Sequence, residues 1–139
     1  MSVETWFRII FVVIAIGMAI YLIVNLTTGR SRVGRRWVER RAAPRIYWAS
    51  VGKTAIFMTA LAITPFFPLQ RDTVPVVFSG LFGGQLFEML VSGIVQMPAA
   101  AFSRAAQPRP YWGWVAFHAA VVILFLFFLI AQRTGFIVL

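Results

Sequence analysis

The sequence has 139 residues, of which 60% are hydrophobic and 12% charged, and its net charge is +9. A soluble domain has about a quarter of its residues charged, so this composition excludes an ordinary soluble domain and favours a chain surrounded by lipid. Four apolar spans of about 20 residues would use nearly all of these residues, which leaves no separate soluble domain among them. The sequence lacks cysteine, which excludes disulfides, iron–sulfur clusters and cysteine-bound zinc.

The first apolar run, residues 7–26, predicts a transmembrane helix that ends at Thr28 and Gly29. Residues 30–45 follow, with seven arginines and one glutamate. Trp37 and Val38 interrupt the charges, so part of this stretch can form a short helix lying on the membrane surface.

The remaining spans follow the same hydropathy argument. The second predicted span covers residues 46–67 and the third covers 74–97, with a linker as short as those of helical hairpins between them. The fourth covers residues 111–131, after a loop that holds Arg104 and Arg109. The sequence therefore predicts an all-α integral membrane protein, a single domain of four transmembrane helices.

The arginines predict the orientation of these spans. The loops after the first and third spans hold nine arginines, seven in the first and two in the second, whereas the opposite side holds Arg8, Arg71 and Arg133. The positive-inside rule places the nine in the cytoplasm and both termini on the non-cytoplasmic side. The arginine bias also suggests the inner membrane of a bacterium. Because the basic residues cluster between apolar runs, they indicate topology and anionic lipid headgroups rather than nucleic acid.

Two stretches match at a spacing of 64 residues. Residues 40–48, RRAAPRIYW, align with residues 104–112, RAAQPRPYW, with six of nine positions identical. One interpretation is a duplicated helical hairpin, with repeats at 1–70 and 71–139. The other is convergence, because proline, arginine, tyrosine and tryptophan are each favoured beside a membrane.

The repeated motif predicts contacts with lipid headgroups. Arginine binds phosphate oxygens bidentately, and the amphipathic rings of tyrosine and tryptophan suit the interface. The predicted interfacial residues are Arg40, Arg45, Tyr47, Trp48, Arg104, Arg109, Tyr111 and Trp112.

Three ionisable side chains fall within predicted spans, namely Lys53, Glu88 and His118. At 1.5 Å per residue each lies about 10–13 Å from the cytoplasmic end of its span, a depth that costs several kcal/mol unless the group is paired or hydrated. In the third span the polar residues step by three, four and four positions, which places them on one helix face. The predicted intramembrane polar site comprises Tyr21, Lys53, Gln85, Glu88, Ser92, Gln96 and His118.

Gly80, Gly83 and Gly84 flank this polar face, and the Gly80–Gly84 spacing allows close helix packing. Each ionisable group also has a purely structural interpretation. Lys53 can extend its amine to the near interface, His118 can be a hydrogen-bonded core residue, and Glu88 can join helices. A single histidine predicts no metal site, and no nucleophile stands beside a base, so we expect no catalytic residue and no cofactor other than bound lipid.

Three functions remain open. The first is a scaffold or accessory subunit of a larger membrane complex, in which the polar face and the glycines pack against another subunit. The second is a homo-oligomeric channel or proton-coupled transporter centred on Glu88. The third is a lipid- or quinone-binding protein. The expected partners are accordingly anionic lipids together with other membrane subunits or further copies of the chain.

Overall fold

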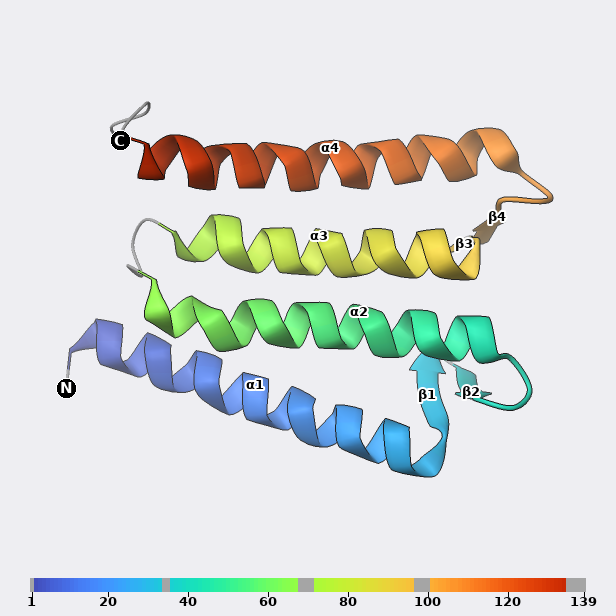
Figure 1. Cartoon of the computed structure of the whole chain (residues 1–139), viewed down its shortest axis with the longest axis horizontal. Coiled ribbons are helices and arrows are strands. Elements are labelled where there is room, and N and C mark those ends of the chain that lie inside the picture. Colours follow the sequence, from blue (N-terminus) through green and yellow to red (C-terminus); the bar gives the residue numbers. More distant parts are fainter. Residues whose placement is uncertain (1, 34–35, 68–71, 97–100, 135–139) are drawn as a thin grey trace.

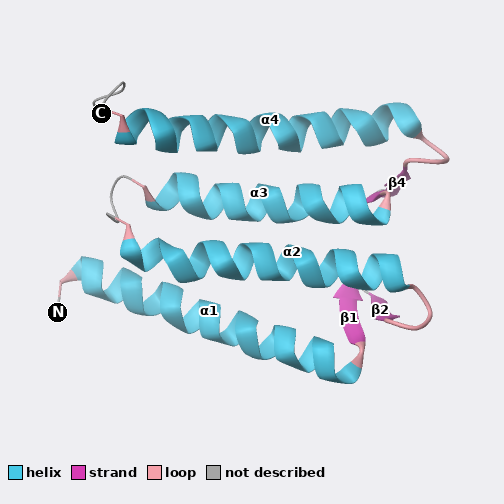
Figure 2. Ribbon diagram, viewed as in Figure 1, coloured by secondary structure: helices cyan, strands magenta, loops and turns pink. Residues whose placement is uncertain are grey.

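A computed structural model describes residues 2–33, 36–67, 72–96 and 101–134. Its long elements are α1 (Val3–Thr28), α2 (Pro44–Ile63), α3 (Thr73–Ser92) and α4 (Pro108–Arg133), and the short 3-10 helix η1 (Thr64–Phe66) continues α2. Two antiparallel ribbons connect the helices, one between α1 and α2 and the other between α3 and α4 (Figure 2). They consist of β1 (Arg30–Val33) with β2 (Arg36–Glu39), and of β3 (Ile94–Gln96) with β4 (Ala101–Ser103).

Each of the four long helices is long enough and apolar enough to cross a membrane, as the hydropathy pattern predicted. Their ends differ from the predicted ones. Helix α4 starts at Pro108, because proline is tolerated in a first turn, where its missing N–H has no partner to lose. Helix α3 stops at Ser92, short of the expected end near residue 97, because Gly93 adopts a left-handed conformation with φ 72°.

The helices form an open row rather than a closed bundle. Within the described residues, close backbone approaches between long helices join α1 to α2, α2 to α3 and α3 to α4, and no others. Figure 1 shows this order, with the start of α1 and the end of α4 on one side and both ribbons at the opposite ends of the helices. Helices α1 and α4 therefore have a helical neighbour on one side only.

The first ribbon replaces the surface helix expected in residues 30–45, and the structure shows that expectation to be wrong. Gly29, with φ 67°, ends α1 and turns the chain into β1. The N–H of Arg40 then donates to the carbonyl of Gly29 at 2.7 Å, so the ribbon closes directly on the helix end. Ser31 is fully buried, and its hydroxyl bonds to that of Ser50 on α2 at 2.9 Å.

The second ribbon repeats the backbone of the first at a spacing of 64 residues. Gly93 takes the place of Gly29, and the N–H of Arg104 donates to its carbonyl at 2.9 Å. The strand pairing matches as well, since Arg30 opposite Glu39 corresponds to Ile94 opposite Ser103. The residue that corresponds to Ser31 is Val95, which packs in an apolar cluster with Met89, Tyr111 and Val115. The two ribbons thus share a backbone arrangement, but at this position the first makes a polar contact and the second an apolar one.

A buried tyrosine joins the two helices of each pair. The hydroxyl of Tyr47 on α2 donates to the carbonyl of Asn25 on α1, and that of Tyr111 on α4 donates to the carbonyl of Met89 on α3, both at 2.8 Å. Each tyrosine bond is the second to its carbonyl, because Asn25 and Met89 already accept from the N–H groups of Gly29 and Gly93. Both tyrosines are fully buried, so their hydroxyls hold helices together rather than facing lipid headgroups as the sequence suggested.

We predict that Tyr47→Phe and Tyr111→Phe each lower stability by about 0.5–1.5 kcal/mol, because each removes one buried hydrogen bond and little else. The measurement is thermal unfolding of the purified protein in mild detergent. Trp48→Phe is the control, since Trp48 is exposed and its loss leaves the helix contacts in place. We call the two junctions, where α1 meets α2 and α3 meets α4 through a ribbon, corners. A loss of stability in only one of the two tyrosine variants would contradict the equivalence of these corners.

Candidate functional site

The interface of α2 and α3 is built on small residues. A Cβ added at Gly80 would collide with the Cβ of Ala60, and one at Gly84 would lie 2.9 Å from the carbonyl oxygen of Lys53. These two glycines therefore allow the close packing that their spacing predicted. Gly83, in contrast, has nothing within 4 Å of its added Cβ. Sequence reasoning missed Gly52, where a Cβ would strike the ring of Phe87.

One ion pair crosses this interface. The Nζ of Lys53 on α2 lies 2.7 Å from Oε2 of Glu88 on α3, and the two side chains are 33% and 18% exposed. The pair supplies each charge with a partner in a part-buried interface, where an unpaired charge is costly.

A second polar contact joins α3 to α4. A hydrogen bond of 2.8 Å links Nε2 of His118 to the side-chain amide of Gln85, and Nδ1 lies 2.9 Å from the carbonyl oxygen of Trp114. The histidine is buried, and the rings of Phe82, Trp114 and Phe117 lie 5.4–6.1 Å from its centroid. His118 therefore has the partners of a hydrogen-bonded core residue.

The polar face of α3 thus divides between its two neighbours, with Glu88 turned to α2 and Gln85 to α4. Ser92 stabilises the end of α3, since its hydroxyl donates to the carbonyl of Glu88 at 2.6 Å and accepts from the N–H of Ile94 at 3.1 Å. Gln96 is exposed on β3, beyond the helix. The hydroxyl of Tyr21 accepts from the N–H of Arg32 at 3.4 Å. Four of the seven predicted polar residues therefore form two cross-helix pairs.

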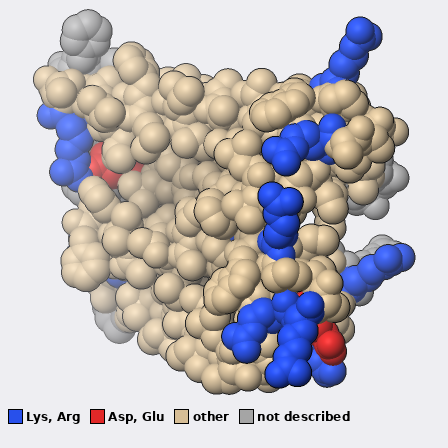
Figure 3. Space-filling model, turned by 45° about the vertical axis from the view of Figure 1, so that its right-hand side comes forward, with Lys and Arg blue, Asp and Glu red and all other residues tan. Residues whose placement is uncertain are grey.

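A cluster of arginine side chains lies at the ends of the helices that carry the ribbons, where Figure 3 shows blue side chains gathered. Arg40, Arg45, Arg104 and Arg109 are all exposed at this end. Trp48 and Trp112 are also exposed. A groove beside Arg40 is lined in addition by Trp37 and Arg41, two residues that the sequence analysis did not assign to a site.

Among the described residues no group of three or more histidine, aspartate or glutamate side chains could hold a metal ion. Comparisons with protein-family models, with curated proteins and with solved structures find no match for this chain.

We predict that Lys53 and Glu88 are energetically coupled by about 0.5–3 kcal/mol in a double-mutant cycle of Lys53→Met and Glu88→Gln. Each single change leaves a polar partner unpaired in an interface, whereas the double change removes both charges. The readout is the free energy of unfolding in detergent. The exposed pair Glu4–Arg8, at 2.8 Å within α1, is the matched control and should couple by about 0.5 kcal/mol or less. Equal coupling in the two cycles would refute a structural role for the inner pair.

Proposed function

We propose that this chain is a scaffold or accessory subunit of a larger membrane complex, joined to its neighbours through the two edge helices α1 and α4. The observation that carries the proposal is the open row. Helices α2 and α3 have a helix on each side, but α1 and α4 do not. A single layer of this kind leaves two helix faces free for further transmembrane helices.

The free edges are broad and apolar. On α1, Ile16, Ile20 and Ile23 are each more than half exposed, and on α4 so are Ile123 and Phe127. Gly17 and Gly113 add room, because nothing lies within 4 Å of a Cβ built on either. Small residues on a free face let another helix approach closely.

We also propose that the chain is a tandem duplication of one helix–ribbon–helix unit. The support is the match of ribbon closure, strand pairing and tyrosine contact at a spacing of 64 residues, which convergence of interfacial composition does not explain. Under this duplication the free face of α4 corresponds to the face of α2 that packs on α3. The free face of α1 likewise corresponds to the face of α3 that packs on α2. Phe117 and Val24 stand where Lys53 and Glu88 form their pair, so neither edge holds an unpaired charge at that position.

For orientation we propose a bacterial inner membrane with the ribbons in the cytoplasm and both termini outside. The support is the arginine count on the two sides together with the common end of the two ribbons (Figure 1). The transport hypothesis has less support, because Glu88 is paired with Lys53 and Gln85 with His118 inside the chain.

The test is native mass spectrometry of the protein released from its own membrane in mild detergent. We expect unlike chains at a fixed ratio in the wild type. Gly17→Leu and Gly113→Leu should release the partners while the chain's own thermal unfolding is unchanged, since each added side chain meets open space.

Gly80→Leu is the matched control for these variants. Its side chain would collide with Ala60, so it should destabilise the chain itself by about 1–3 kcal/mol. A wild type that is purified only as a monomer or as a homo-oligomer would contradict the proposal.

A further inference from the structure

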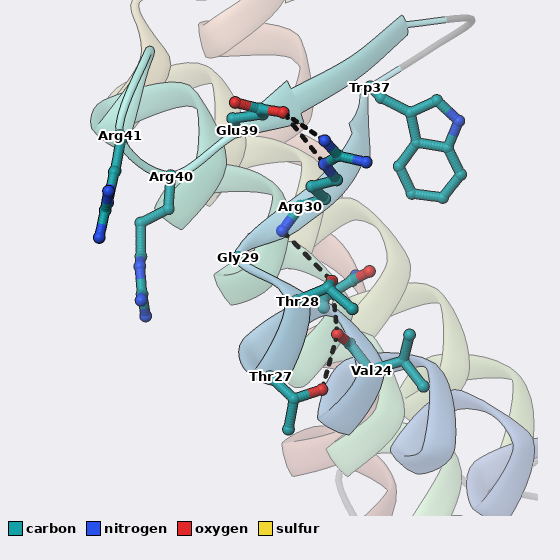
Figure 4. A pocket seen from close by; sticks show the side chains of 10 residues that line it. Val24, Thr27, Thr28, Gly29, Arg30, Trp37, Glu39, Arg40 and Arg41 are labelled. Atoms are coloured by element: carbon teal, nitrogen blue, oxygen red, sulfur yellow. Dashed lines mark hydrogen bonds and ion pairs between the residues drawn. The ribbon is translucent and has the colours of Figure 1, made fainter.

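A groove lies at the junction of α1 with the first ribbon. Its volume is about 850 Å³, and it is lined by Val24, Asn25, Thr27, Thr28, Gly29, Arg30, Trp37, Glu39, Arg40 and Arg41. Figure 4 shows these side chains around the last turn of α1. The lining carries three arginines and one glutamate, so it is cationic.

The charges in the groove are not equivalent. Arg30 and Glu39 neutralise each other, because Nε and Nη2 of Arg30 lie 3.0 and 2.8 Å from Oε1 of Glu39. In contrast, no hydrogen bond or ion pair within the described residues engages the guanidinium groups of Arg40 and Arg41. Both side chains extend in the same direction from the end of β2 (Figure 4). Two free guanidinium groups side by side form a site for an anion with several oxygen atoms.

The second corner indicates that this lining is not needed to build the fold. The same ribbon forms there with Ile94, Ala101, Ser103 and Ala105 at the positions of Arg30, Trp37, Glu39 and Arg41. Among the charged and aromatic residues of the lining, only Arg40 has a counterpart of its own kind, Arg104. The backbone N–H of each of these two arginines closes its ribbon. The side chains that make the first groove cationic and aromatic are therefore available for a ligand.

The groove continues onto an apolar surface. Val24 lines it and is 49% exposed, and Ile20 lies one turn earlier on α1 with 58% exposure. Trp37, at 63% exposure, flanks the groove as an amphipathic ring. A ligand that fits both parts has an anionic head and an apolar tail.

We propose that this groove binds an anionic phospholipid. Its phosphate contacts the guanidinium groups of Arg40 and Arg41, its headgroup lies beside Trp37, and an acyl chain runs along the face of α1 that carries Val24 and Ile20. The acyl chain and the partner helix proposed above both use the free face of α1 at Ile20 and Val24. The two proposals are tested separately, because one experiment counts lipid bound to the isolated chain and the other counts unlike chains in the native complex.

The experiment titrates the delipidated full chain with phosphatidylglycerol in detergent micelles and counts bound lipid by native mass spectrometry. The Arg40→Gln/Arg41→Gln variant should bind about tenfold more weakly, the equivalent of about 1.4 kcal/mol. The control is Arg32→Gln/Arg36→Gln, which removes the same charge from exposed positions on the same ribbon outside the groove, and its affinity should stay within about twofold. The variant Arg40→Lys/Arg41→Lys keeps the charge without the forked donors and should fall between the two.

Two further arms separate the possible sources of the phosphate. Phosphatidylcholine should bind more weakly than phosphatidylglycerol, and inorganic phosphate or glycerol phosphate should not displace the bound lipid. Displacement by the soluble phosphates would overturn the lipid assignment in favour of a soluble anion. An equal loss of lipid affinity in the Arg32→Gln/Arg36→Gln control would show that the basic ribbon attracts lipid through its charge alone. That result would also overturn the assignment of the groove.

Discussion

The packing of α2 against α3 is the contact on which the whole described structure depends, because every other approach between long helices lies within one half of the chain. It relies on the absence of side chains at Gly80 and Gly84, which brings the backbones close. That proximity in turn lets Lys53 reach Glu88 at 2.7 Å. The glycines set the distance between α2 and α3, and at that distance the two part-buried charges neutralise each other.

The corners, where α1 meets α2 and α3 meets α4, provide hydrogen bonds for backbone groups at the helix ends. In each half a left-handed glycine turns the chain, a ribbon closes on that glycine, and a tyrosine hydroxyl reaches back to the preceding helix. The two corners share this backbone but differ in their side chains. The first corner is cationic and aromatic around Arg40 and Trp37, and the second is apolar around Val95.

Hydropathy and glycine spacing predicted the four spans and the role of Gly80 and Gly84, because both signals are local. The motif at residues 40–48 and 104–112 likewise predicted where the two halves match. The ribbons were missed, since strands of three or four residues are fixed by the turns at Gly29 and Gly93 and by the bonds from Arg40 and Arg104, not by a sequence pattern. The polar face of α3 was predicted as one site, but a helix with two neighbours can divide such a face, and sequence periodicity does not say which helices are neighbours.

The central claim is the open row, and the separation of its edge helices tests it most directly. Spin labels at Val13→Cys and Ile123→Cys, both exposed and equally far along their helices from the ribbon end, suit the cysteine-free chain. Pulsed electron–electron double resonance in lipid nanodiscs, with labelled protein diluted by unlabelled protein, gives the distance. Three steps of 8–10 Å place the axes of α1 and α4 about 24–30 Å apart, and the account predicts a single distance in that range. A distance near 10 Å, as between adjacent helices of a closed bundle, would contradict it.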